Sequence, residues 1–270
     1  MKKGLVMALS LTLVLSFAAC GNNGTTDSSA SSEEVSSVAS ESKDDASVES
    51  TEEVSSETEN TDVAGETVMS YADYVAAELE SPVVIEAYVQ AHQSWWDNKI
   101  TVYAADEDGA YFIYNMTCSE EDSAKLVPGT KIKVTGYKTE WSGEVEIAEG
   151  ATFEIEDGSY IAEATDVTDL LGTDDLINYQ NQFVSFKGMT VEESEGGAAF
   201  LYNWDGSGSA DSNSDLYFNV SLNGQTYTFT VESYLCDNTT DVYKTVEGLK
   251  VGDVIDMEGF LYWYNGVNPH

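Results

Sequence analysis

The sequence predicts a mainly β fold: two tandem OB-like, five-stranded Greek-key barrels with short helices, which follow a disordered tether. Three observations support this prediction. The chain after residue 67 contains an internal repeat. The copies share an order of three strands, a short helix and then another strand, as in an OB-fold. Residues 21–67 contain no aromatic residue, whereas the chain after them is rich in Trp, Tyr and Phe.

Residues 1–20 read as a lipoprotein signal peptide. Lys2 and Lys3 form a basic start and residues 4–17 form an apolar run, which is too short for a permanent membrane span. Ala18 and Ala19 directly before Cys20 resemble the bacterial lipobox, in which the cysteine is lipidated and becomes the mature N-terminus. We therefore expect a palmitate-type anchor on Cys20 and a location on the extracytoplasmic face of the cell membrane. An ordinary secreted protein with an unrelated cysteine is the alternative.

Residues 21–67 are predicted to be a disordered acidic tether. The stretch is dominated by Ser, Glu, Asp, Thr and Ala. Such a composition buries too little apolar area to offset the loss of chain entropy on folding, and like charges extend it. Its expected role is a spacer between the membrane and the folded part. A recruiting role for the acidic run is the alternative.

The charge of the chain is strongly negative. The formal net charge is −38, and the sequence contains no arginine. Nucleic-acid binding depends on Lys and Arg that neutralise phosphates, so this composition predicts no nucleic-acid partner. Contact with the membrane is expected through the lipid anchor only. Cationic partners, metal ions and neutral ligands such as sugars remain.

The internal repeat is clearest where residues 126–143 align with residues 249–266 without a gap. Tyr137 corresponds to Phe260, and five further pairs are identical. The identical pairs are Leu126 and Leu249, Gly129 and Gly252, Ile132 and Ile255, Gly136 and Gly259, and Gly143 and Gly266. Upstream, with gaps, Trp96-Asp97 falls on Trp204-Asp205. The repeat therefore predicts two copies of one domain.

The first OB-like domain is expected over residues 68–160. Apolar residues of 70–79 lie on roughly one face of a predicted N-terminal helix. Asp108-Gly109 is a hairpin signal between two strands, and Ser119 with Asp122 is a weak capping box before a short helix. The five predicted strands are 83–93, 99–105, 111–116, 131–138 and 144–148.

A helical linker is expected over residues 161–180, with its helix at 168–179, and the second OB-like domain over 181–270. The second domain repeats the order with strands at 182–192, 216–222, 225–232 and 253–261 and a helix at 237–246. The sequence ends where a fifth strand is expected to begin. Truncation is the favoured interpretation, because an unclosed barrel exposes a strand edge; closure of the barrel in another way is the alternative.

The stretches YVQAHQSWWDNKITVYAADEDGAYFIYNM and LVPGTKIKVTGYKTEWSGEVEI, together with the lipobox, resemble a group of OB-fold-containing lipoproteins of low-GC Gram-positive bacteria. The resemblance covers both domains and the N-terminal end. It implies the location and the fold. It brings no catalytic residues with it.

All five tryptophans fall at the two loops where OB-folds bind ligands. Trp95 and Trp96 lie in the first such loop of the first domain and Trp141 in the second; Trp204 and Trp263 hold the matching places in the second domain. Since alternate strand residues face opposite sides, at most one of Trp95 and Trp96 easily enters the core. The aromatic loops predict a ligand-binding face, and packing of the tryptophans at barrel ends is the alternative.

The ligand suggested by this face is a cell-wall glycan, because sugar rings stack on indoles while Asp97 and Asp205 can bond hydroxyl groups. A protein partner fits about as well, since Trp and Tyr are favoured at interfaces. Residues 205–215 place oxygen-bearing side chains at alternate positions and form a weak calcium candidate. The pattern departs from an EF-hand, so no cofactor is expected. The calcium candidates are Asp205, Asp211, Asn213 and Asp215.

Catalysis is not expected. His92 is the only histidine apart from His270, and neither a nucleophile elbow nor a phosphate loop is present. We therefore predict a membrane-anchored, non-catalytic binding module outside the cell. A structural or adhesion scaffold without a small-molecule ligand is the alternative, and a glycan hydrolase is a further, weaker one.

Overall fold

The computed structural model describes residues 67–270. The predicted signal peptide, the lipidation site at Cys20 and nearly all of the tether lie outside the described residues. Within residues 67–270, no helix combines the length and the apolar character that crossing a membrane requires. The two β units described below belong to one compact unit.

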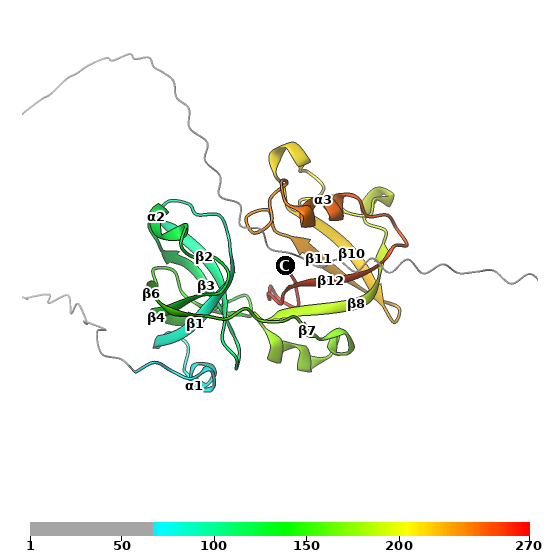
Figure 1. Cartoon of the computed structure of the whole chain (residues 1–270). Helices are drawn as coiled ribbons and strands as arrows, with labels where there is room; N and C mark the ends of the chain where they lie inside the picture. The colour runs from blue at the N-terminus through cyan, green and yellow to red at the C-terminus, as the bar shows by residue number, and fades with distance from the viewer. Residues whose placement is uncertain (1–66) are drawn as a thin grey trace, which may run out of the picture. The chain divides into compact units, whose positions relative to one another are not determined.

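Five strands of the first unit close into a barrel in the order β1-β2-β3-β5-β4, and β4 pairs with β1 to complete the ring (Figure 1). All of these pairings are antiparallel except that of β3 with β5. Alternate apolar residues of the strands point inward and form one core, as period-2 patterning requires. The strands are β1 (Pro82–His92), β2 (Lys99–Ala105), β3 (Ala110–Thr117), β4 (Thr130–Trp141) and β5 (Glu144–Ile147).

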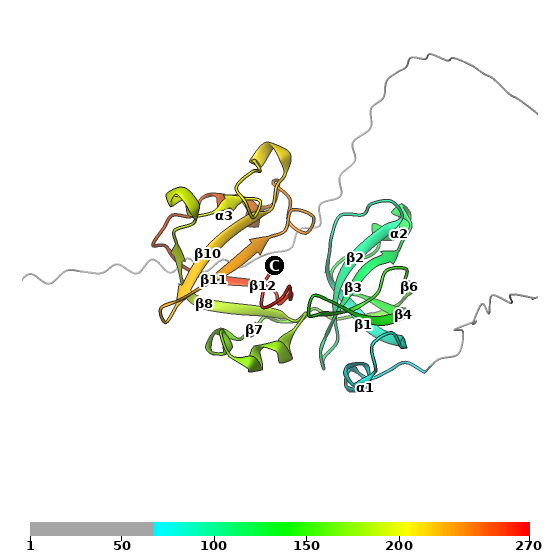
Figure 2. The same cartoon turned by 180° about the vertical axis from the view of Figure 1, so that it is seen from behind.

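Two short helices lie at opposite ends of this barrel, as both views show (Figure 1, Figure 2). Helix α1 (Tyr71–Ala76) begins after its N-cap Ser70, and α2 (Glu120–Ser123) begins after Ser119, whose hydroxyl accepts the Asp122 N–H as the capping signal predicts. The buried Lys138 ammonium donates to three carbonyl oxygens at the end of α1, at 2.8–3.0 Å. It thereby ties α1 to β4.

The second unit repeats the order of elements. Its sheet runs β11-β10-β8-β12, and β8 takes the place that β1 has in the first unit. Helix α3 (Asp241–Glu247) follows the third strand and starts after the N-cap Thr240. The mainly β fold with two OB-like units is therefore confirmed. The strands are β8 (Phe183–Glu192), β10 (Leu216–Leu222), β11 (Gln225–Val231) and β12 (Val254–Phe260), with the two-residue β9 (Leu201–Tyr202) beside β10.

The last residues of the chain lie where the first unit has β5. His270 exchanges two backbone hydrogen bonds with Phe260 of β12, and Thr230 of β11 donates to the Pro269 carbonyl. The repeat supports the equivalence: a Cβ on Gly136 would meet Ile147 of β5, whereas a Cβ on Gly259 would meet the His270 carbonyl. Residues 269–270 thus bridge β11 and β12, as β5 bridges β3 and β4.

The structure differs from the sequence prediction between and after the strands. The helix expected at 168–179 is two 3-10 helices, η1 (Thr168–Leu170) and η2 (Asp174–Tyr179), because Gly172 adopts a positive φ of 85° between them. Three strands were not predicted: β6 (Thr152–Ser159), which pairs with β4, the short β7 (Thr165–Asp166), which pairs with β8, and the two-residue β9, which pairs with β10.

Candidate functional site

The two adjacent tryptophans have different environments. Trp95 packs against the core of the first unit, and its indole N–H donates to the Cys118 carbonyl at 2.9 Å. Trp96 is 73% exposed. Asp97, at the turn that follows, is also exposed and has a positive φ of 48°. One indole therefore completes the core and its neighbour is left to solvent.

A groove in the second unit has a volume of about 590 Å³. Its walls come from β10, β11, the loop before β10 and the segment after β12. These are the strand 2–3 face and the two loops at which OB-folds bind ligands. The seven lining residues are Trp204, Tyr217, Tyr227, Thr228, Tyr264, Val267 and Asn268.

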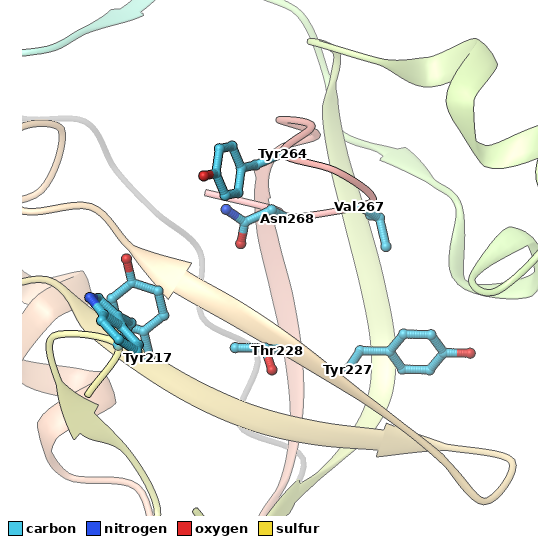
Figure 3. A pocket seen from close by; sticks show the side chains of 7 residues that line it. Tyr217, Tyr227, Thr228, Tyr264, Val267 and Asn268 are labelled. Atoms are coloured by element: carbon cyan, nitrogen blue, oxygen red, sulfur yellow. The ribbon is translucent and has the colours of Figure 1, made fainter. Parts of the chain in front are cut away.

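The alternation of side chains along β10 and β11 determines which of them point toward the groove. Figure 3 shows Tyr227 and Thr228, consecutive on β11, pointing in opposite directions. The Tyr227 hydroxyl donates to Gln225 at 2.7 Å, whereas Thr228 bonds the Asn219 amide oxygen across the β10–β11 pair at 2.8 Å. Tyr217, Thr228 and Asn268 therefore offer hydroxyl and amide groups beside aromatic rings.

The groove has aromatic walls and no charged lining residue. Trp204 is 76% exposed and Tyr264 is 49% exposed, so both rings are open to solvent. Burial, with the nearby carboxyls of Asp215 and Glu232, raises the pKa of Tyr217, so its hydroxyl stays neutral and can donate. Such a surface suits a neutral ligand with apolar faces and hydroxyl groups.

The other two predicted tryptophans lie at the β4–β5 hairpin and the segment after β12. Trp141 is 53% exposed, and its ring centroid lies 5.1 Å from that of Tyr264. Trp263 is half-buried and its side chain lies so close to Gly143 that a Cβ there would be 2.9 Å from it. Trp263 does not line the groove, whereas Tyr264, Val267 and Asn268 of the same segment do.

A buried carboxyl holds the segment after β12 in place. Glu144 of β5 accepts the Trp263 backbone N–H at 2.8 Å and the Gln180 amide at 3.2 Å, while its second oxygen is buried without a partner. Burial raises the pKa of Glu144 to about 8 and that of Glu146 to about 7. Neither carboxyl lines the groove, so their raised pKa values do not make a catalytic pair there.

The loop of the weak calcium candidates is held by local hydrogen bonds. Asp205 accepts the Ser207 N–H, Asn213 accepts the Asn238 N–H, and Asp215 accepts both the backbone and hydroxyl donors of Ser233. Asp211 lies in the short 3-10 helix of this loop. Among residues 67–270, no three His, Cys, Asp or Glu side chains are grouped so as to hold a metal ion. Neither the expectation of no cofactor nor the weak calcium candidate is tested by these contacts.

The matching face of the first unit is covered. Tyr103 of β2 and Phe112 of β3 point outward from their barrel and pack in one cluster with Phe260. Tyr103 stacks on Phe260 with ring centroids 4.3 Å apart, and its hydroxyl contacts His270 at 3.2 Å. Burial lowers the pKa of His270 to about 4, which keeps this imidazole neutral near pH 7. The open OB-like face therefore belongs to the second unit.

Neither protein-family models nor curated proteins give a match to this chain. Solved structures that resemble it include several HIN domains. The Ifi202 HINa domain in complex with 20bp dsDNA is 14% identical, with 56% of this chain and 74% of that chain covered and a TM-score of 0.31. A murine DNA-binding protein bound with ds DNA is 10% identical, with 70% and 91% covered and a TM-score of 0.34. A structure described as "Structural mimicry for functional antagonism" is 13% identical, with 71% and 90% covered and a TM-score of 0.33.

The prediction that the chain has no nucleic-acid partner is contradicted by these matches. Three of the similar structures, including p202 HIN1 with a 12-mer, contain double-stranded DNA. OB-folds as a class also bind oligonucleotides, so net charge is no ground for exclusion. At these identities the likeness concerns the fold alone. DNA is accordingly a ligand to be tested.

The structure brings some of the predicted site residues together. Trp204 lines the groove, and Trp141 touches its wall at Tyr264, whereas Trp95, Trp96 and Asp97 are not lining residues. Sequence reasoning missed the other six lining residues, which are Tyr217, Tyr227, Thr228, Tyr264, Val267 and Asn268. The alternation of Leu216–Leu222 and Gln225–Val231 could have identified Tyr217 and Thr228, because the outward positions of these strands carry Tyr, Asn, Ser and Thr.

Proposed function

We propose that this chain is a lipid-anchored binding protein on the outer side of the cell membrane, and that the groove of its second unit binds a neutral oligosaccharide. The observation that carries the proposal is the aromatic, uncharged groove at the OB ligand site. Its volume of about 590 Å³ lies in the range of small-molecule sites. Catalysis is no part of the proposal.

The chemistry of the lining favours a sugar. Trp204 and Tyr264 present exposed ring faces to which the C–H face of a pyranose can stack. Tyr217, Thr228 and Asn268 supply donors and acceptors for its hydroxyl groups. Apolar walls with a few fixed polar groups are the usual composition of a ligand site.

The anchor rests on the sequence. The basic start, the apolar run and the small residues before Cys20 support lipidation, and the acidic stretch that follows supports a spacer. The chain resembles lipoproteins of Gram-positive bacteria, whose cell wall lies outside the membrane. A cell-wall glycan is therefore the ligand that we expect. Extraction of the chain from membranes tests the anchor separately. The wild type is expected to resist extraction, and Cys20→Ser is expected to lose this resistance.

A scaffold without a small-molecule ligand is the second candidate. It is favoured by Trp95 and Trp263, which pack against the protein, and by the covered face of the first unit. In that case Trp204 and Tyr264 would meet a protein partner, since exposed Trp and Tyr are favoured at protein interfaces.

Tryptophan fluorescence of residues 21–270 with acrylamide quenching tests the groove. Soluble cell-wall glycan fragments are expected to protect the wild type and Trp96→Ala from quenching, and Trp204→Ala is expected to lose this protection. Single- and double-stranded DNA are titrated in parallel. The glycan proposal would be overturned if DNA protected the tryptophans and the glycan fragments did not. It would also be overturned if none of the added ligands gave protection.

A further inference from the structure

The aromatic surface of the groove continues beyond the second unit. Tyr264, at one wall, lies against Trp141 of the β4–β5 hairpin, with ring centroids 5.1 Å apart and an interplanar angle of 35°. Both rings are about half exposed, at 49% and 53%. A ligand that stacks on Tyr264 therefore has a second aromatic surface directly beside it.

The pair is held by backbone contacts on both sides. The Asn265 N–H donates to the Ser142 carbonyl at 2.7 Å, and the Trp263 N–H donates to Glu144 at 2.8 Å. These contacts join the tip of the hairpin to the residues that flank Tyr264. An aromatic pair with fixed partners loses little conformational entropy on binding, which favours affinity.

The hairpin tip fits this arrangement closely. Gly143 has a positive φ of 91°, and the Trp263 ring occupies the space where a Cβ would otherwise lie. This contact lets the two loops approach, and Trp141 stays half exposed beside Tyr264. Trp141 has no role in either barrel core among the described residues.

We propose that Trp141 is an additional stacking site for the ligand of the groove, so that the ligand is an oligosaccharide long enough to reach from Trp204 past Tyr264 to Trp141. The inference rests on the proposed function. It adds the size class of the ligand and assigns a residue of the first unit to the site of the second. A short ligand that occupies only the Trp204 end of the groove would leave Trp141 uncovered.

The test is a length series. Affinities of oligosaccharides from the disaccharide to the octasaccharide of the cell-wall glycan are measured by calorimetry for wild type, Trp141→Ala, Trp204→Ala and Trp96→Ala. Trp141→Ala is expected to weaken the longest ligands about tenfold, as loss of an interfacial tryptophan commonly does, and to leave the shortest unchanged. Trp96→Ala is the matched control, an exposed tryptophan outside the groove.

The outcomes separate the two proposals. Glycan binding that is lost in Trp204→Ala but equal in wild type and Trp141→Ala at every length would overturn the role of Trp141 and leave the groove intact. No glycan binding by the wild type would overturn both. Trp141→Tyr, which keeps an aromatic face, is expected to recover part of the affinity, and its failure to do so with an unchanged melting temperature would contradict stacking.

Discussion

The two OB-like units use the same outer face in opposite ways. In the first unit this face carries Tyr103 and Phe112 and is buried against Phe260. In the second unit it carries Tyr217 and Thr228, which line an open groove. The inward residues of the strands are apolar in both units, so both sequences form the core that the fold requires.

The difference lies in the residues between the core positions. In β2 and β3 the outward positions include large aromatic rings, which gain free energy when a neighbour covers them. In β10 and β11 they are Tyr217 and otherwise Asn, Ser and Thr, whose amide and hydroxyl groups lose free energy when buried without partners. One fold thereby yields one packing face and one face for a ligand.

The largest expected effect is on the covered face. Tyr103→Ala removes a fully buried ring stacked on Phe260 and is expected to lower the free energy of unfolding by about 3–5 kcal/mol. Tyr217→Ala, at the open face, is expected to change it by less than about 1 kcal/mol. Urea unfolding followed by circular dichroism measures both. Equal effects of the two substitutions would show that the faces do not differ as described.

The next effect concerns pH. The unfolded chain loses the Glu144 proton near the ordinary pKa of 4.5, whereas burial keeps it on the folded chain up to about 8. The folded state therefore binds more protons in this range, and stability falls as pH rises. Glu144→Gln removes this dependence and keeps an acceptor for the Trp263 N–H. The stability of the variant relative to wild type is expected to rise on the order of 4 kcal/mol between roughly pH 5 and 9.

Glu140→Gln is the matched control for Glu144. It removes a carboxyl from the same hairpin, but Glu140 is exposed on β4. Thermal unfolding of the three proteins across this pH range measures the difference. A pH dependence that is the same in Glu144→Gln and wild type would contradict a protonated, buried Glu144.

Much of the fold could be predicted from the sequence. Strands β2 and β10 have the predicted bounds, because each alternates apolar residues between clear turn signals. The repeat positions Gly129 and Gly252 share a positive φ, at 92° and 90°. Strand β6 was missed because most of its residues are exposed and give no apolar alternation.

The site could be predicted only in part. The positions of the tryptophans between the predicted strands placed them at both ligand loops, and Trp204 does line the groove. Which ring of an adjacent pair enters the core depends on tertiary contacts such as that of Trp95 with Cys118. The approach of Trp141 to Tyr264 depends on how the two units pack, which no local pattern encodes.

A smaller effect separates the two adjacent tryptophans. Trp95→Phe leaves the Cys118 carbonyl without its indole donor and is expected to cost about 1–2 kcal/mol of stability. Trp96→Phe, at an exposed position, is expected to cost less than about 0.5 kcal/mol and to remove the more readily quenched emission. Unfolding curves and acrylamide quenching measure the two quantities. A greater loss of stability in Trp96→Phe than in Trp95→Phe would contradict the assignment of Trp95 to the core and of Trp96 to the surface.

The smallest expected effect is on one hydroxyl of the open face. Thr228→Val keeps the shape of the side chain but removes a groove hydroxyl, so glycan affinity is expected to fall about fivefold, the equivalent of one hydrogen bond. Stability should change little, because the bond of Thr228 to Asn219 is exposed. Thr226→Val, on the same strand outside the groove lining, is the control. An equal loss of affinity in both variants would mean that the β11 surface, and not the groove, meets the ligand.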